Sequence, residues 1–243
     1  MRIGIFDSGI GGLTVLKSLI NRHPNHSYYY FGDSKNLPYG SKSKDELLGL
    51  SKMIIDFLID KEVDLIIIAC GTVSSNIYEE LKGIYNIPIF DIINPTIKYI
   101  KDNNINNVGI IATSATINSK VFENKLDINV ISKACPMFVP MIEKRLINTD
   151  EFNNYLDEYL SVFKNNTDAL VLGCTHYPLI SNEINKYLNN VLLINMGDAI
   201  ANHIYLDKEE KQNIELYFSK VDDNIMINVN NLIGDYEIIE KEL

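Results

Sequence analysis

The sequence predicts an α/β protein with two similar lobes, each a mostly parallel sheet flanked by helices and related to the other by pseudo-symmetry. Short apolar runs rich in β-forming residues alternate with stretches of helical periodicity along the whole chain. Two of these runs recur later, in the same order and at nearly the same spacing. Alternation of this kind is typical of parallel strands covered by helices on both faces.

Eight apolar runs are predicted to be strands. Each is short and rich in branched or aromatic residues, and together they span 2–6, 28–31, 65–69, 87–91, 108–112, 128–132, 169–173 and 191–195. Between them, apolar residues recur at helical spacing, for example over 44–61 and 151–165. Parallel strands need crossover connections of about a dozen residues or more, and these helical stretches are long enough to supply them.

Two pairs of segments indicate an internal duplication. Residues 3–9 (IGIFDSG) match 108–114 (VGIIATS) at an offset of 105 (108 − 3). Residues 64–72 (DLIIIACGT) match 168–176 (DALVLGCTH), and their cysteines are offset by 104 (174 − 70). Buried strands can look alike by chance, but here the order, the offset and the terminal cysteine all agree. We therefore expect two lobes built on one plan.

The boundary between the lobes is expected near residues 92–97, where a proline interrupts the pattern. The N-terminal lobe would comprise 1–95 together with the C-terminal tail 205–243, and the C-terminal lobe would comprise 96–204. The tail contains a charged, loop-like stretch over 207–212, then a strand-like run and a helix-like end. Because it has no sheet of its own, we expect it to return to the N-terminal lobe.

Composition and charge narrow the class of protein. The chain has 243 residues and a net charge of −10, which argues against a nucleic-acid partner because binding phosphate backbones needs a basic face. The uninterrupted apolar run at 65–70 is far too short to span a membrane. Three cysteines are an odd number for a disulfide framework, which favours a cytoplasmic, reducing compartment.

The two matched cysteines are the strongest functional signal. Cys70 and Cys174 each lie where a predicted strand gives way to a helix, beyond the carboxyl end of the strand, where open parallel sheets bind ligands. Backbone donors and the helix dipole there are expected to lower a thiol pKa from about 8.5 toward neutrality. Cys135 has no matched partner and is assigned a structural role. Two thiols from opposite lobes suit removal of a proton from one face of a carbon and its return to the other.

Zinc binding, hydrolysis and redox chemistry are alternative roles for the same residues. Cys70, Cys174, His176 and Asp7 could bind zinc, although no CxxC or HExxH spacing occurs. A hydrolytic Cys–His pair would leave the second matched thiol without a role. A redox pair is disfavoured because redox cysteines usually lie close together in sequence.

The motifs in this chain resemble those of the glutamate racemases, the cofactor-independent enzymes of the aspartate/glutamate racemase superfamily. The resemblance covers nearly the whole length and rests on the segments 3–16, 30–40, 66–72, 134–143 and 170–179. It implies an active site between two α/β lobes, interconversion of L- and D-glutamate, no cofactor and no metal. It also implies a homodimer that supplies D-glutamate for peptidoglycan.

The resemblance assigns roles to residues at matching positions. The expected catalytic residues are Cys70, Cys174, Asp7, His176 and Glu143. The expected substrate-binding residues are Asp7, Ser8, Tyr39, Gly40, Gly71, Thr72, Thr175 and His176. By the same resemblance, Cys70 would deprotonate D-glutamate and Cys174 would deprotonate L-glutamate.

One position departs from the family pattern. The family's first cysteine motif usually reads Cys-Asn-Thr, whereas this chain has Cys70-Gly71-Thr72. The missing side-chain amide is expected to change binding detail rather than abolish activity. It keeps open an aspartate or other amino-acid racemase of the same superfamily. A catalytically silent amino-acid-binding regulator and a zinc hydrolase are the alternatives from other classes.

Overall fold

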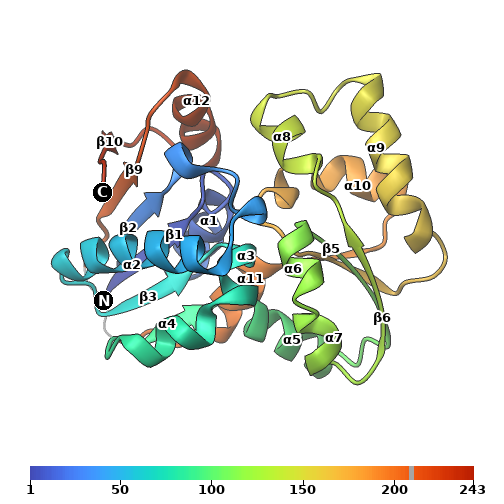
Figure 1. The fold of residues 1–243 in the computed structure, drawn as a ribbon, viewed down its shortest axis with the longest axis horizontal. Helices are drawn as coiled ribbons and strands as arrows, with labels where there is room; N and C mark the ends of the chain where they lie inside the picture. The colour runs from blue at the N-terminus through green and yellow to red at the C-terminus, as the bar shows by residue number, and fades with distance from the viewer. Residues whose placement is uncertain (208–210) are drawn as a thin grey trace.

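The computed structural model describes residues 1–207 and 211–243, and within them it contains two separate sheets flanked by helices (Figure 1). The first sheet has the strand order β10-β9-β2-β1-β3-β4 and the second has β6-β5-β7-β8. Every strand pair in both sheets runs parallel. The predicted fold class is therefore confirmed.

All eight predicted strands are present, and the tail adds two more. Their bounds are β1 Arg2–Asp7, β2 Ser27–Gly32, β3 Leu65–Ile68, β4 Ile89–Asp91, β5 Asn107–Ala112, β6 Asn129–Ala134, β7 Ala169–Leu172, β8 Leu192–Asn195, β9 Ile214–Phe218 and β10 Ile238–Glu240. The α-helices are α1 Leu13–Arg22, α2 Lys44–Asp60, α3 Gly71–Asn76, α4 Tyr78–Ile84, α5 Ile93–Asp102, α6 Ser114–Asn118, α7 Val121–Lys125, α8 Phe138–Glu143, α9 Asp150–Leu160, α10 Ser181–Tyr187, α11 Met196–His203 and α12 Asp223–Leu232. Short 3₁₀ turns cover Ser34–Asn36, Tyr39–Ser41, Ser161–Phe163 and Tyr177–Ile180.

The internal duplication is visible in the topology. The order β2-β1-β3-β4 in the first sheet is repeated as β6-β5-β7-β8 in the second. The register repeats as well, because Ile3 pairs with Leu65 and the equivalent Val108 pairs with Ala169. These pairs are offset by 105 (108 − 3) and 104 (169 − 65), the values read from the sequence. The matched segments therefore occupy matched places.

Strands β1, β2, β3, β5 and β7 are buried on both faces, which explains their nearly continuous apolar sequences. In β1, Ile3 and Ile5 face one core cluster, while Phe6 faces another on the opposite side of the sheet. In β5, Ile110 joins the first of these clusters and Ile111 joins a third. The first cluster therefore includes side chains from both sheets and runs continuously between the lobes.

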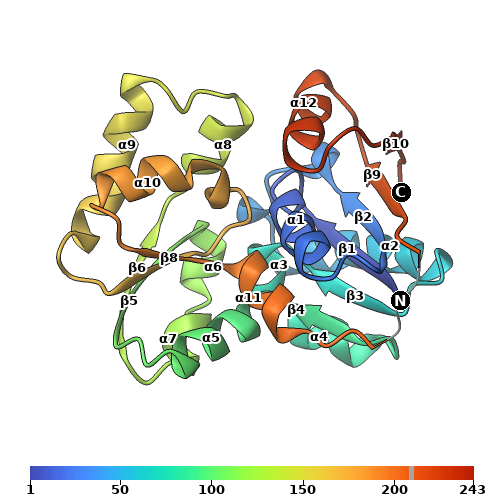
Figure 2. The ribbon, with the colours of Figure 1, turned by 180° about the vertical axis from the view of Figure 1, so that it is seen from behind.

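Helix α11 lies against α1 and α5 and connects the two lobes (Figure 2). Ser18 on α1 donates a hydrogen bond to Asp198 on α11 at 2.6 Å. Thr14, one turn earlier on α1, donates to the backbone carbonyl of Thr175 at 2.9 Å. These contacts hold the segment after β7 against the first lobe and so help to set the geometry of the site described below.

The expected helices and the tail differ from the structure only in detail. The helix predicted at 44–61 runs from Lys44 to Asp60 and begins at a capping box formed by Ser43 and Glu46. The helix predicted at 151–165 ends at Leu160, followed by a 3₁₀ turn. In the tail, β9 pairs with β2 and β10 pairs with β9, so the tail extends the first sheet as expected.

The helix-like end of the tail is α12, and the short edge strand β10 that follows it was not anticipated. Part of the charged stretch expected at 207–212 lies outside the described residues. Within the described ranges, every helix is too short or too polar to cross a membrane.

Candidate active site

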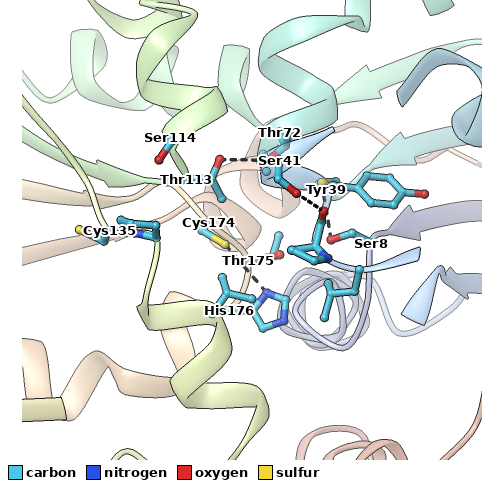
Figure 3. A pocket seen from close by; sticks show the side chains of 18 of the residues that line it. Ser8, Tyr39, Ser41, Thr72, Thr113, Ser114, Cys135, Cys174, Thr175 and His176 are labelled. Carbon is cyan, nitrogen blue, oxygen red and sulfur yellow. Dashed lines mark hydrogen bonds between the residues drawn. The ribbon is translucent and has the colours of Figure 1, made fainter. Parts of the chain in front are cut away.

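A cavity of about 320 Å³ lies at the carboxyl ends of the central strands and is lined by residues of both lobes (Figure 3). Volumes of this order suit small-molecule ligands. The first sheet's lobe contributes residues that follow β1, β2 and β3, and the other lobe contributes residues that follow β5, β6 and β7. The duplication therefore brings equivalent strand ends to a single site.

Cys70 and Cys174 both line this cavity. Cys70 is the residue before α3 and is 4% exposed, and Cys174 follows β7 and is 7% exposed. Because each comes from the equivalent strand of its own lobe, the two thiols enter the cavity from different halves of the protein. This is the arrangement predicted from the matched segments.

Cys174 has an acid–base neighbour. The Nδ1 atom of His176 lies 3.9 Å from the Cys174 sulfur, and the Nε2 atom of His176 donates to Glu143 Oε1 at 2.7 Å. Burial alone would lower the pKa of His176, but hydrogen bonds and charge interactions with Cys174 and Glu143 raise it well above its ordinary value. A protonated imidazole in this place would put a positive charge and a hydrogen-bond donor beside the Cys174 sulfur.

Cys70 lies in a different environment. Its sulfur is 4.0 Å from the hydroxyl of Ser8. Burial raises the pKa of the Cys70 thiol, and the nearby charge of Asp7 raises it further, while backbone hydrogen bonds from Val73 and Thr72 lower it by less. The expectation of a lowered pKa at this helix N-terminus is therefore wrong for Cys70. The reason is that desolvation and a nearby carboxylate outweigh the helix-end donors.

Asp7 is fully buried behind the cavity wall rather than in its lining. Its Oδ2 atom accepts a hydrogen bond from the backbone N–H of Gly12 at 2.7 Å and one from the hydroxyl of Thr175 at 3.3 Å. Among the described residues, its other oxygen, Oδ1, has no hydrogen-bond partner. Burial raises the pKa of the Asp7 carboxyl, opposed by the charge of His176. Asp7 therefore lies between the two lobes, close to both catalytic candidates.

A network beneath the cavity holds the loop after β2. Tyr39, which is 1% exposed, donates from its hydroxyl to Asp33 Oδ2 at 2.6 Å. Ser219, just after β9 in the tail, donates to Asp33 Oδ1 at 2.7 Å. Asn36 donates to the same carboxylate. The ring of Tyr39 and the adjacent Gly40 are thereby fixed as part of the cavity wall.

Comparison with known proteins identifies the family. A family model described as Asp/Glu/Hydantoin racemase matches residues 14–204. The glutamate racemase of Aquifex pyrophilus is 38% identical over 98% of this chain and 96% of its own length. That of Hydrogenobaculum sp. is 41% identical over 96% of this chain and 93% of its own length. The chain belongs to the glutamate racemases.

A solved structure of this family has the same fold. The glutamate racemase of Francisella tularensis, crystallised in complex with D-glutamate, is 33% identical and superposes with a TM-score of 0.86. The match covers 100% of this chain and 97% of that chain. The two-lobe arrangement is therefore that of the family.

Gly71 lies where the two lobes meet, and the structure shows what its small size permits. A Cβ atom at residue 71 would lie 2.7 Å from the backbone oxygen of Gly173, which belongs to the other lobe. Next to it, Thr72 shares a hydrogen bond with Thr113 across the lobes at 3.0 Å (Figure 3). The missing side chain thus allows the two lobes to approach closely at the edge of the cavity.

The structure adds lining residues that the sequence reasoning missed. Thr113 and Ser114 line the cavity from the end of β5. They were detectable, because the repeat makes Thr113 the equivalent of Ser8 at the offset of 105 (113 − 8).

Cys135 also contributes to the lining, although it is fully buried. Its thiol donates to the Lys133 carbonyl at 3.6 Å, and its sulfur points away from Cys174 (Figure 3).

Two predicted site residues, Asp7 and Glu143, lie outside the lining and contact residues that belong to it. The other predicted residues all line the cavity: Ser8, Tyr39, Gly40, Cys70, Gly71, Thr72, Cys174, Thr175 and His176. Across residues 1–207 and 211–243, no group of three or more His, Cys, Asp or Glu residues is arranged to hold a metal ion.

Proposed function

We propose that this glutamate racemase uses Cys70 and Cys174 to interconvert L- and D-glutamate by proton transfer at the α-carbon. The observation that carries the proposal is the entry of the two thiols into one cavity from equivalent strand ends of the repeated lobes. A racemase needs an acid and a base on opposite faces of one carbon, and a duplicated fold supplies two such groups.

The environments of the two thiols indicate which one starts as the base and which one as the acid. With L-glutamate bound, the Cys174 thiolate takes the α-proton, and the electron pair of the C–H bond moves into the α-carboxylate. Cys70 then gives its thiol proton to the opposite face of the carbon and is left as a thiolate. The raised pKa of Cys70 and the imidazole beside Cys174 support this starting state. The pairing of Cys174 with the L enantiomer follows the family resemblance.

Acid–base catalysis alone is too weak for so poor a carbon acid, since a positioned group contributes about 10²–10⁴-fold. Donors must stabilise the charge that develops on the α-carboxylate. We assign this role to the hydroxyls of Ser8, Thr72 and Thr175, all in the cavity lining, and to backbone N–H groups at the start of α3. Tyr39 and Gly40 form the wall that excludes water.

We assign the two buried carboxylates to the support of the two thiols. Glu143 holds His176 beside Cys174. Asp7 is close enough to Cys70 for its charge to act on that thiol, and its partner-free Oδ1 is available to a ligand's ammonium group if the cavity wall opens. Movement of the lobes about residues 92–97 would open and close access to the site.

Several cellular properties complete the proposal. We propose that the enzyme supplies D-glutamate for peptidoglycan, acts in the cytoplasm and forms a homodimer, as its family resemblance implies. The three free, buried cysteines suit a reducing compartment. We also propose the domain limits 1–95 with 205–243, and 96–204, because the strands of the first sheet fall in the former and those of the second in the latter.

Solvent hydrogen exchange tests the two-thiol mechanism. Purified wild type, Cys70→Ala and Cys174→Ala are incubated with each enantiomer of glutamate in deuterated water. Wild type should racemise glutamate and incorporate deuterium at the α-carbon, and both variants should lose racemisation. Racemisation near the wild-type rate in either variant would refute the mechanism.

The same assay separates the alternative functions. Circular dichroism on L-glutamate, D-glutamate and L-aspartate should show turnover of glutamate. Faster turnover of aspartate would favour the other racemases of the superfamily. Binding of glutamate without turnover would favour a silent regulator.

A further inference from the structure

Asn224 reaches from one lobe to the catalytic candidates of the other. It lies on α12, in the tail that joins the first sheet, and α12 faces α8 of the other lobe (Figure 1). The Nδ2 atom of Asn224 donates to Glu143 Oε2 at 3.1 Å. Glu143 Oε1 accepts from His176, whose other ring nitrogen approaches Cys174. Four side chains therefore form a chain of contacts that ends at one of the two thiols.

The orientation of the Asn224 amide is itself determined by the helix. Asn228, one turn later, donates to Asn224 Oδ1 at 3.0 Å and to its backbone carbonyl at 2.8 Å. The first turn of α12 is anchored by Asp222, which accepts from the backbone N–H of Ile225 at 2.9 Å. With its oxygen occupied by Asn228, the amide of Asn224 presents its N–H₂ group to Glu143.

We propose that Asn224 is a positioning residue that acts through Glu143 and His176 on the Cys174 half of the reaction, and this rests on the proposed function. Glu143 is partly exposed, with 19% of its side chain accessible, so a free carboxylate there could rotate into solvent. Binding by His176 at one oxygen and by Asn224 at the other prevents this rotation. The imidazole then keeps its place beside Cys174.

The effect of Asn224 should be one-sided. Cys70 lies beside Ser8, and Asp7 raises its pKa. Among the hydrogen bonds of the described residues, those of the Asp7 side chain run to Gly12 and Thr175 rather than to Asn224, Glu143 or His176, and Asp7 interacts with His176 through charge. Loss of Asn224 should therefore raise the barrier for proton transfer at Cys174 and leave the barrier at Cys70 nearly unchanged. A contact that merely held the lobes together would affect both barriers alike.

Isotope effects distinguish these cases. Racemisation has an equilibrium constant of one, so kcat/KM must be equal in the two directions and cannot report asymmetry. Primary isotope effects on kcat/KM are instead measured with α-deuterated L-glutamate and α-deuterated D-glutamate. In Asn224→Ala, kcat/KM should fall about 3- to 10-fold. This is the range expected when a hydrogen bond to a charged group is lost and part of its free energy reaches Cys174 through Glu143 and His176.

The two isotope effects should move in opposite directions. With L-glutamate, abstraction by Cys174 becomes more rate-limiting and the effect increases. With D-glutamate, the later reprotonation by Cys174 becomes limiting, so abstraction by Cys70 becomes reversible and the effect falls from its kinetic value toward the smaller equilibrium isotope effect. A parallel change of both effects, or no change in either, would overturn the proposal.

Three controls keep the outcome specific. Asn230→Ala changes an exposed asparagine on the same helix and should leave both isotope effects at their wild-type values. In a Glu143→Gln background, adding Asn224→Ala should cause no further change; an additional effect would contradict action through Glu143. Thermal unfolding of Asn224→Ala separates a catalytic effect from loss of the fold.

Failure of the wild-type protein itself to racemise glutamate would refute the proposed function, and this inference with it.

Discussion

Glu143 Oε1 lies 2.7 Å from His176 Nε2, and this pair has no counterpart beside Cys70, where the nearby carboxylate of Asp7 acts without an intervening imidazole. The duplicated lobes therefore present two equivalent thiols in unequal surroundings. Burial and Asp7 raise the pKa of the Cys70 thiol, while Cys174 lies beside His176, whose pKa is raised by its interactions with Cys174 and Glu143. The asymmetry matches the starting state proposed for L-glutamate, in which Cys70 is the acid and Cys174 is the base, whereas turnover of D-glutamate starts from the reverse state.

Stability should depend on pH through His176. The folded-state pKa of His176 is raised, so its contribution is fully present below the unfolded value of about 6.5 and is lost as pH rises through the folded value. Glu143→Gln should therefore lower the free energy of unfolding by about 1.5–3 kcal/mol at pH 6. The difference from wild type should shrink as the pH rises above about 6.5 and through the raised folded-state pKa of His176. Urea denaturation across this range measures it.

A matched control is Glu62→Gln, which removes an exposed carboxylate paired with Arg2. Such surface pairs contribute little, so its effect should be small at every pH. A Glu143→Gln effect that stayed constant with pH would show that the pair does not favour protonation of His176.

Gly71→Ala should be harmful although alanine is the better helix former. The added methyl group would approach the Gly173 oxygen to 2.7 Å, and a backbone oxygen cannot move aside without shifting the lobe. We expect a loss of about 1–3 kcal/mol in stability, typical of overpacking, and a lower kcat/KM. Chemical denaturation and the racemisation assay test this.

Gly83→Ala is the comparison for Gly71→Ala. A Cβ atom at Gly83, within α4, would meet nothing within 4 Å. Alanine there should stabilise the protein by up to about 1 kcal/mol and leave activity unchanged. Equal effects of the two substitutions would contradict a close contact between the lobes at Gly71.

Gly11→Ala should disturb the contact between the N-terminal lobe and the segment that holds Thr175 and His176. A Cβ atom at residue 11 would overlap His176 Nδ1 and lie 2.5 Å from the hydroxyl of Thr175. His176 would have to leave its place beside Cys174, so we expect kcat to fall by more than about tenfold, within the contribution of a positioned acid–base group. Steady-state kinetics give the measurement, and unchanged kcat would show that His176 can move without cost.

Tyr39→Phe tests the network under the cavity. It removes the hydroxyl that donates to Asp33 at 2.6 Å and should cost about 1.5–3 kcal/mol of stability, the range for a hydrogen bond to a charged group. KM for glutamate should rise severalfold because the wall formed by Tyr39 and Gly40 loosens. Tyr205→Phe is the control, since Tyr205 is 87% exposed and should tolerate the change. A KM equal to that of wild type would indicate that the loop is held by other contacts.

The parts of the site that follow strands directly were predictable from sequence. Ser8, Cys70 and Cys174 come within a few residues of a β-strand, and the carboxyl ends of parallel strands meet at one edge of a sheet. The repeat relates Thr113 to Ser8, so the place of Thr113 at the cavity was predictable as well. Contacts between distant segments were not predictable, since no local pattern links Asn224 to Glu143 or Ser219 to Asp33.

The raised pKa of Cys70 is a second property that the local sequence does not predict. Its place before α3 correctly indicated backbone donors at the thiol. The sequence did not reveal that the thiol would be desolvated and placed near Asp7, and these two effects dominate. A local position predicts a helix-end field, but only packing determines how much water and how many charges surround the group.

Strand periodicity and repeated motifs are local properties of the chain, so the sequence already indicated the α/β class, the duplication and the two thiols. It also showed that different residues follow the two thiols, Gly71-Thr72 after Cys70 and Thr175-His176 after Cys174. The tertiary structure adds which charged groups from distant segments surround each thiol. His176, Glu143 and Asn224 come together beside Cys174 from three separate segments, and Asp7 lies near Cys70 within the closed interface. Long-range packing creates these surroundings, and no local motif specifies them.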